Sequence, residues 1–256
     1  MTFSLTGDAY DRFMGRYSEP LSGRFADFAR PGRGSMLDIG CGPGALTAEL
    51  AERVGAENVS AIDPEEHFLD ACRARVPGVD ARRGLAEDLP YDDGEFAAAL
   101  SQLVLHFSEE PERAAEEMVR VVRPGGVVAA CTWVVRGVEM LNVVWDSADG
   151  LVAPTASGAE SRQRLRTAGQ LEALFAGAGV EKLETATLEV EASYADFDDF
   201  WLPITNAAGP IGTFYGRLSE DHRAGLRERC RERLDDPQGP FTLTATACAV
   251  RGRTAA

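Results

Sequence analysis

Three glycines at alternate positions, Gly40, Gly42 and Gly44, stand between an apolar run at residues 35–39 and a helical pattern at 45–54. Glycine adopts left-handed backbone angles without steric cost and allows a ligand to approach the main chain closely. A helix that begins directly after such a turn directs its free N–H groups and its positive dipole end toward the same place. The sequence therefore predicts a ligand site at a strand-to-helix turn.

The same order of strand and helix repeats along the chain from residue 35 to 133. Apolar runs that predict strands alternate with segments of helical spacing, and the expected strands are 35–39, 58–62, 80–84, 96–100 and 127–133. Strands that are apolar throughout and alternate with helices are typical of a parallel sheet covered on both faces. Residues 180–191 and 241–250 alternate apolar and polar side chains, which predicts two antiparallel strands. The expected fold is α/β, with a doubly wound, mostly parallel sheet.

We divide the chain into three parts. Residues 1–34 form an expected N-terminal helical lid, and residues 35–191 with 241–256 form the expected α/β core. Residues 192–240 begin with many aromatic side chains and lie between the two antiparallel strands, so we expect a small cap insertion that shapes a substrate pocket.

The charge balance and the cysteines limit the possible partners. The chain has 26 basic and 41 acidic residues and a formal net charge of −15, which repels phosphate backbones and anionic lipid. Five cysteines without metal-ligand spacing argue against a zinc site and against a disulfide framework. We expect a cytoplasmic protein that holds no metal, and no nucleic-acid or membrane partner. The sequence leaves the oligomeric state open.

Asp63 ends the second expected strand, 19 residues after Gly44. A carboxylate at that place accepts hydrogen bonds from the two hydroxyls of a ribose. The glycine turn and Asp63 together predict a nucleoside-type ligand at the point where the strand order reverses.

Two kinds of nucleoside ligand fit this arrangement. Gly40, Gly42 and Ala45 satisfy the G-x-G-x-x-G/A pattern of dinucleotide binding, which keeps an NAD(P)-dependent oxidoreductase as an alternative. However, Asp38 would place a negative charge beside a pyrophosphate, and Pro43 has no N–H to offer it. An acid at position 38 suits a ligand that carries an ammonium group.

The ordered set Asp38 to Gly44, Asp63, Ala86 to Pro90, Asp93-Gly94 and Arg123 to Gly126 resembles class I S-adenosylmethionine-dependent methyltransferases. The resemblance is to the bacterial small-molecule group with ubiquinone- and menaquinone-type enzymes, and the segment Tyr10 to Tyr17 resembles their N-terminal segment. It implies a seven-stranded sheet with an antiparallel last strand and S-adenosyl-L-methionine as the cofactor. The implied reaction moves a methyl group to an O, N or C atom of a small-molecule acceptor by in-line displacement. A non-catalytic protein that binds the cofactor is the alternative.

The resemblance also implies a role for each matched residue. Asp38 would hold the methionine ammonium indirectly, Asp63 the ribose hydroxyls, and Ala86 with Glu87 the adenine edge. Tyr17 and Arg16 would cover the cofactor carboxylate, and Ser101 and Gln102 would face the sulfonium. The implied cofactor-binding set is Arg16, Tyr17, Asp38, Gly40, Cys41, Gly42, Gly44, Asp63, Pro64, Ala86, Glu87, Ser101 and Gln102.

Leu85 and His106 are two further positions in the expected site. Leu85 stands where the family often has an acid that accepts the adenine amino group. His106 follows Ser101 by five residues and is the candidate general base for the acceptor's proton, a role in which a histidine is common. Its alternative is a polar residue that closes the strand-to-helix loop through hydrogen bonds to the backbone.

Overall fold

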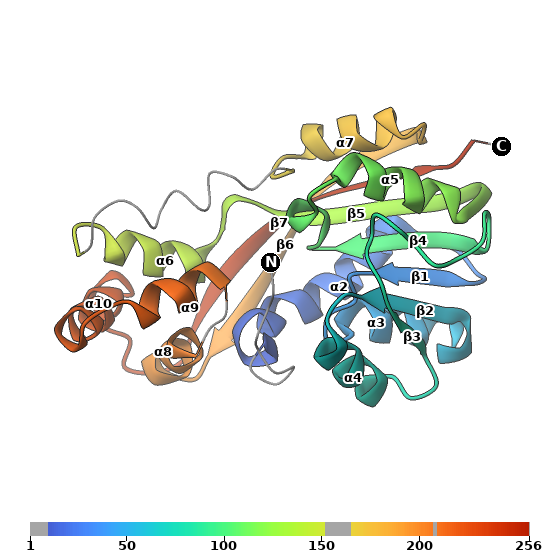
Figure 1. The fold of residues 1–256 in the computed structure, drawn as a ribbon. Helices are drawn as coiled ribbons and strands as arrows, with labels where there is room; N and C mark the ends of the chain where they lie inside the picture. Colours follow the sequence, from blue (N-terminus) through green and yellow to red (C-terminus); the bar gives the residue numbers. More distant parts are fainter. Residues whose placement is uncertain (1–9, 152–164, 207–208, 256) are drawn as a thin grey trace.

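A seven-stranded sheet forms the centre of the computed structural model (Figure 1), in which residues 10–151, 165–206 and 209–255 are described. The strand order is β3-β2-β1-β4-β5-β7-β6. β7 pairs in antiparallel fashion with both of its neighbours, and the remaining pairs are parallel. The prediction of a mostly parallel seven-stranded sheet with an antiparallel last strand is confirmed. The strands are β1 (Met36–Ile39), β2 (Val59–Asp63), β3 (Asp80–Arg83), β4 (Phe96–Gln102), β5 (Val122–Val138), β6 (Glu181–Tyr194) and β7 (Phe241–Arg253).

Helices cover both faces of this sheet (Figure 1). On one face α2 contacts α3, and α3 contacts α4; on the other face α5 contacts α7. All four residues of β1 are buried, and so are all seven of β4, because both strands have helices above and below them. These helices are α2 (Arg16–Ala29), α3 (Ala45–Val54), α4 (Glu66–Arg75), α5 (Pro111–Arg120) and α7 (Ala168–Gly177).

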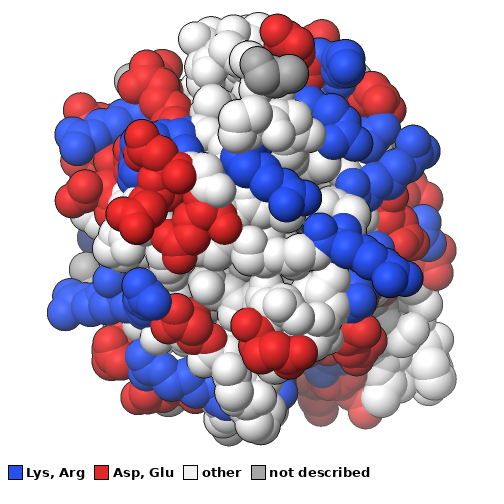
Figure 2. Space-filling view, turned by 90° about the vertical axis from the view of Figure 1, so that its right-hand side faces the viewer, with Lys and Arg blue, Asp and Glu red and all other residues white. Residues whose placement is uncertain are grey.

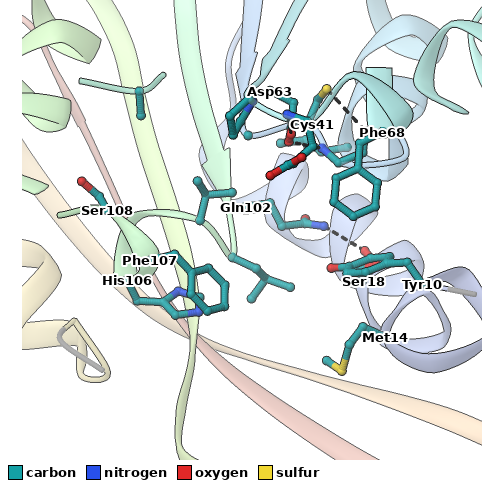
Figure 3. Close-up of a pocket in the computed structure, with 18 of the residues that line it drawn as sticks. Tyr10, Met14, Ser18, Cys41, Asp63, Phe68, Gln102, His106, Phe107 and Ser108 are labelled. Carbon is teal, nitrogen blue, oxygen red and sulfur yellow. Dashed lines mark hydrogen bonds between the residues drawn. The ribbon is translucent and has the colours of Figure 1, made fainter. Parts of the chain in front are cut away.

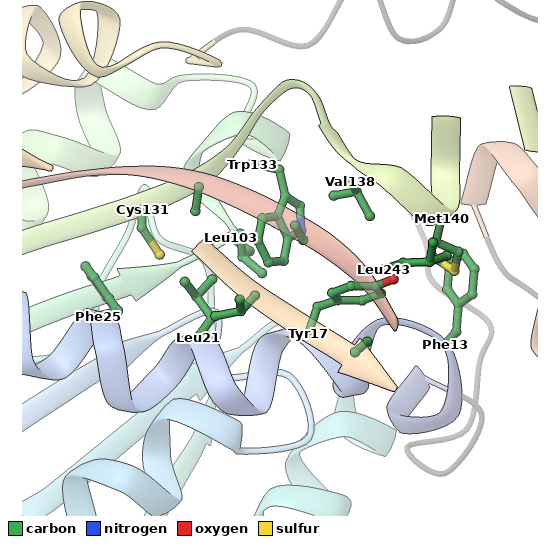
Figure 4. Close-up of a cluster of buried hydrophobic side chains, with 14 of the residues drawn as sticks. Phe13, Tyr17, Leu21, Phe25, Leu103, Cys131, Trp133, Val138, Met140 and Leu243 are labelled. Atoms are coloured by element: carbon green, nitrogen blue, oxygen red, sulfur yellow. The ribbon is translucent and has the colours of Figure 1, made fainter. Parts of the chain in front are cut away.

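The N-terminal helix α2 packs on the sheet through a row of buried side chains. Tyr17, Leu21 and Phe25 are fully buried and point from α2 toward the sheet, where they lie close to Cys131 and Trp133 of β5 (Figure 4). α2 therefore forms one layer of the fold, and the expected N-terminal lid at residues 1–34 stays a prediction. The turn that precedes it, η1 (Asp11–Gly15), is a short π-helix.

The cap is built from two places in the sequence. β5, β6 and β7 extend past the other strands and carry a group of four helices at one end of the molecule (Figure 1). Three of these helices lie in the expected insertion 192–240, but α6 comes from the chain after β5 and contacts α10. We call these four the cap helices: α6 (Glu139–Ala148), α8 (Phe197–Thr205), α9 (Gly209–Gly216) and α10 (Glu220–Arg233).

One face of the molecule carries side chains of both charges. Figure 2 shows the face at the amino ends of the parallel strands, where basic and acidic side chains are interspersed. Among residues 10–151, 165–206 and 209–255, no helix has both the length and the hydropathy that crossing a bilayer requires.

The position of α2 in the core gives a direct test. Phe25→Ala should lower the free energy of unfolding by about 3–5 kcal/mol, because it removes a fully buried aromatic ring from a packed layer. Arg24→Ala, at an exposed position of the same helix, should change it by less than about 0.5 kcal/mol. Urea denaturation of both variants makes the comparison. A small loss for Phe25→Ala would show that α2 is a loosely attached lid.

Candidate functional site

A cavity of about 570 Å³ opens at the carboxyl ends of β1, β2 and β4. Pockets for small-molecule ligands fall in the range of roughly 300–1,000 Å³, and open α/β sheets bind ligands at this edge. One end of the cavity is formed by the glycine turn and the end of β2 (Figure 3). Apolar side chains from η1, β5 and the cap helices line the other end.

The glycine turn is fixed by the neighbouring strand. The N–H groups of Gly40 and Cys41 both donate to the carbonyl of Ile62, at 2.8 and 3.0 Å. Gly40 has φ of +71°, and a Cβ atom there would lie 2.4 Å from Val104 Cγ2. Gly42 has φ of +52° with open space where its Cβ would be. The turn thus requires glycine for its backbone angle and keeps an open main-chain surface.

Asp63 ties the turn to the end of β2. Its carboxylate accepts from the N–H of Gly42 at 3.0 Å and from the N–H of Glu65 at 2.9 Å. Each carboxylate oxygen has a second acceptor position, so Asp63 is able to accept hydroxyl donors from a ligand as well. Burial raises the pKa of Asp63, while the two backbone hydrogen bonds oppose that rise.

Asp38 lies beneath the turn and is almost fully buried. Its Oδ2 accepts a hydrogen bond of 2.6 Å from the Thr47 hydroxyl in the first turn of α3. Burial, reinforced by the nearby charge of Asp63, raises the pKa of Asp38 to about 7. Two carboxylates at this end of the cavity favour a ligand group that carries positive charge.

The loop after β3 forms the opposite lip of the cavity. Leu85 is 54% exposed there, and Ala86 and Glu87 also line the cavity. The Ser108 hydroxyl, from the loop after η3 (Leu105–Phe107), donates to Glu87 Oε1. The exposed apolar side chain of Leu85 at this lip favours contact with a flat ring over contact with a polar group.

Gln102 and His106 come from the end of β4 and from η3. Gln102 Nε2 donates to the Ser18 carbonyl at 2.9 Å and to the Ser22 hydroxyl at 3.0 Å, which joins β4 to α2 (Figure 3). His106 Nδ1 lies 3.0 Å from the hydroxyl of Thr132 on β5. Burial, together with the nearby Arg166 guanidinium, lowers the pKa of His106 to about 3.

The far end of the cavity is mainly apolar. Its walls come from elements that lie far apart in the sequence, namely η1, β5, α6 and α9. Arg166 is the one basic side chain in the cavity lining among the described residues, and its Nη1 lies 3.4 Å from the Trp133 carbonyl, to which it donates. The apolar lining residues at this end are Phe13, Met14, Leu103, Trp133, Leu141, Trp145 and Ile211.

Comparison with known proteins identifies the domain that carries the glycine turn. Residues 37–130 match the protein family described as methyltransferase domain. The matched range runs from β1 into β5, and so contains the turn, Asp63 and the loop with His106.

Curated relatives of the methyltransferase domain include enzymes of several kinds. An uncharacterised methyltransferase of Mycobacterium tuberculosis is 35% identical over 150 residues, which are 58% of this chain and 54% of that protein. The demethylmenaquinone methyltransferase of Desulfitobacterium hafniense is 34% identical over 109 residues, 40% of this chain and 43% of that protein. The chain spans about half the length of these curated relatives.

Solved structures show the same fold over nearly the whole chain. Phosphoethanolamine N-methyltransferase 2 of Haemonchus contortus, solved with S-adenosyl-L-methionine, has a TM-score of 0.56 at 16% identity and covers 96% of this chain and 59% of its own. The cyclase SpnF has a TM-score of 0.55 at 18% identity and covers 93% of this chain and 82% of its own. At such identities the likeness shows the fold and not the reaction.

Most residues proposed for cofactor binding line the cavity of the methyltransferase domain. These are Asp38, Gly40, Cys41, Gly42, Asp63, Pro64, Ala86, Glu87 and Gln102, and the candidate base His106 lines it as well. Gly44 does not line the cavity, and its Cβ position lies 2.9 Å from Cys72 Sγ, so glycine is needed there for close packing on α4.

Three further residues of the expected cofactor-binding set do not line the cavity. Ser101 is fully buried, and its hydroxyl donates to the Ile39 carbonyl at 3.1 Å, because alternate residues of β4 face opposite sides of the sheet. Tyr17 bonds the Tyr194 hydroxyl at 2.9 Å. Arg16 donates to Asp199 Oδ2 at 2.9 Å, on the side of the cap helices. The expectation that these three residues contact the cofactor stays a prediction, which their positions outside the cavity lining do not support.

The N-terminal segment still contributes to the cavity, through other residues. Tyr10, Phe13, Met14 and Ser18 line it, and the Tyr10 ring packs edge-on against Phe68. Burial raises the pKa of Tyr10 to about 12, so its hydroxyl remains protonated. Apolar residues at 13 and 14, one helical turn before Tyr17, were the available sequence signal for this wall.

The raised pKa of Asp38 predicts a pH-dependent stability. The folded state holds a proton on Asp38 between about pH 4 and pH 7 that the unfolded state has lost. The free energy of unfolding should therefore rise as the pH falls from about 8 to about 5, and Asp38→Asn should remove that contribution. Urea denaturation across this range measures the difference between wild type and variant. Identical pH dependence in the two proteins would contradict a buried, proton-binding Asp38.

Proposed function

We propose that the protein is an S-adenosyl-L-methionine-dependent methyltransferase that acts on a small organic acceptor. The observation that carries this proposal is the single cavity with two different ends: an acidic end at the open glycine turn and an apolar end under the cap helices. The methyl donor fits the first end by charge and shape, and its reactive methyl group would then face the second. The curated methyltransferases that match the domain support the reaction type.

The residues present fit this cofactor. The open main chain at Gly42 accommodates its amino-acid part, and the Asp63 carboxylate has acceptor capacity left for the two ribose hydroxyls. Asp38 stabilises the ammonium group through the surrounding field, since its own oxygen is bonded to Thr47. Leu85 and Ala86 form an apolar lip for adenine, which supplies by contact what an acid at position 85 would supply by hydrogen bonding.

The chain's own contribution to the reaction is alignment and exclusion of water. The bound cofactor supplies a methyl group on a positively charged sulfur, which is already activated toward a nucleophile. The apolar walls formed by Phe13, Trp133 and Trp145 hold an acceptor in line with that group and keep water out. Alignment of this kind contributes on the order of 7–11 kcal/mol at best.

We also propose an acceptor class and a cellular location for this function. The apolar far end favours a small, largely apolar acceptor over a nucleic acid or a membrane lipid, and the transferred methyl group would go to O, N or C. All five cysteines are free and buried, which agrees with the proposed cytoplasmic location.

One observation supports a second candidate function, and another argues against an oxidoreductase. The likeness to the cyclase SpnF shows that this fold is also found in a protein named for another reaction, so a role without methyl transfer is the second candidate. An NAD(P)-dependent oxidoreductase is disfavoured, because the buried Asp38 and Asp63 would both lie close to a pyrophosphate.

Asp63 gives a test of the cofactor site. Asp63→Ala should weaken binding of S-adenosylhomocysteine at least about tenfold, because hydrogen bonds to a charged group contribute about 1.5–3 kcal/mol. Isothermal titration calorimetry measures the dissociation constant. Asp92→Ala, an exposed acid in the loop before β4, is the matched control and should bind as wild type does. Wild-type affinity in Asp63→Ala would place the ribose elsewhere.

The reaction itself is tested with a labelled methyl donor. Incubation with radiolabelled S-adenosyl-L-methionine and a panel of hydroxyl, amine and carbon-acid acceptors should label at least one acceptor. In a thermal-shift assay, S-adenosylhomocysteine should raise the melting temperature, and NADH and NADPH should not. Binding of S-adenosylhomocysteine without labelling of any acceptor would favour the non-catalytic role. A shift produced by the nicotinamide cofactors alone would favour the oxidoreductase.

A further inference from the structure

The hydrogen bond between Thr132 and His106 determines which ring nitrogen faces the acceptor. Thr132 is 1% exposed in the middle of β5, and its Oγ1 lies 3.0 Å from His106 Nδ1. Within the described ranges, the Thr132 hydroxyl makes no other hydrogen bond. A buried hydroxyl has one proton to donate, and leaving that donor unpaired costs free energy. The arrangement satisfies the hydroxyl only if it donates to Nδ1.

The hydrogen bond to Thr132 determines which nitrogen of the His106 ring carries the proton. A neutral imidazole has one N–H and one unprotonated nitrogen. If Nδ1 accepts from Thr132, the ring proton is on Nε2, the nitrogen that has no hydrogen bond to the described residues. His106 lines the cavity, so a ligand there can accept from Nε2–H. The opposite tautomer would leave the buried Thr132 proton without an acceptor.

We propose that Thr132 holds His106 as the neutral Nε2–H tautomer, so that His106 donates a hydrogen bond to an oxygen of the acceptor and does not remove its proton. This inference rests on the proposed methyltransferase function and names its acceptor class. The acceptor is an apolar compound whose oxygen is already ionised, such as a phenolate or enolate. Thr132 is a positioning residue, which acts through the imidazole.

The methyl-transfer step balances without a base. The acceptor's oxygen anion attacks the methyl carbon, the carbon–sulfur bond breaks, and its electron pair remains on the sulfur. A positive donor and a negative acceptor give two products without those charges, and no proton moves to His106. The Nε2–H group holds the oxygen before attack, and the lowered pKa of His106 agrees with a ring that stays neutral. Arg166 is the charged side chain that acts on the ring, and it disfavours an imidazolium.

Nuclear magnetic resonance tests the tautomer without any knowledge of the natural acceptor. The chain has three histidines, so long-range proton–nitrogen correlations of the full-length protein resolve each ring, and His106→Gln assigns the signal. The Nε2–H pattern is expected for His106, without titration from about pH 8 to about pH 5. An Nδ1–H pattern, or titration of His106 near the ordinary histidine pKa, would overturn the proposal.

Variants of Thr132 separate positioning from packing. Thr132→Val keeps the shape but removes the hydroxyl, so the His106 pattern should change to a mixture of tautomers. Thr132→Ser should restore the wild-type pattern, and Thr185→Val, an exposed position on β6, should leave it unchanged. An unchanged His106 pattern in a folded Thr132→Val protein would overturn the role of Thr132. If Thr132→Val does not fold, the tautomer of His106 in the wild-type protein and in Thr132→Ser tests the role of Thr132 instead. An Nδ1–H pattern in either protein would overturn that role.

The acceptor class is tested on protein saturated with S-adenosylhomocysteine. Addition of 4-nitrophenol above its pKa should shift the His106 Nε2–H signal, whereas nitrobenzene, which lacks the ionised oxygen, should not. His106→Leu should bind the phenolate about tenfold more weakly by calorimetry. A shift with both probes or with neither would overturn the acceptor class. Failure of the protein to bind S-adenosylhomocysteine would instead count against the proposed function, and the tautomer measurement does not depend on it.

Discussion

The Asp63 carboxylate is the group on which the candidate site depends. It accepts from the main chain of Gly42 on one side and of Glu65 on the other, and so joins the turn after β1 to the start of α4. This junction lies where the strand order reverses, with β1 between β2 and β4. A side chain that organises two loops and retains acceptor capacity couples the fold to ligand binding directly. Asp38, beneath the same turn, adds a second acid that is buried at a cost in free energy.

The two ends of the cavity come from two levels of organisation. The acidic end is formed by local turns within the matched range 37–130, where each strand leads directly into a loop that lines the cavity. The apolar end depends on tertiary packing, because β5, β6 and β7 extend past the other strands of the sheet and carry the cap helices. The proposed cofactor site and the proposed acceptor pocket are therefore built from different parts of the molecule.

The local patterns predicted much of this architecture. The helix expected at 45–54 is α3, and the run 96–100 lies within β4, because glycine turns and continuous apolar runs are strong local signals. The residues at the carboxyl strand ends, such as Asp63, could also be placed, since parallel strands bring their ends to one edge of a sheet. The length of β5 and the contribution of α6 to the cap could not, because they depend on partners distant in sequence.

The side-chain directions were harder to predict than the elements. Ser101 and Gln102 are neighbours on β4, yet only Gln102 lines the cavity, because a shift of one residue reverses the face. Arg16 and Tyr17 turn toward Asp199 and Tyr194, partners that lie more than 170 residues away along the chain. Thr132 carried no sequence signal, since its importance comes from one hydrogen bond across two elements.

A crystal structure of the protein with S-adenosylhomocysteine measures the central claim most directly. The account predicts that both ribose hydroxyls lie within hydrogen-bond distance of the Asp63 carboxylate, and that the sulfur faces the walls formed by Trp133 and Trp145. Electron density for the nucleoside outside this cavity, or with its ribose away from Asp63, would contradict the account.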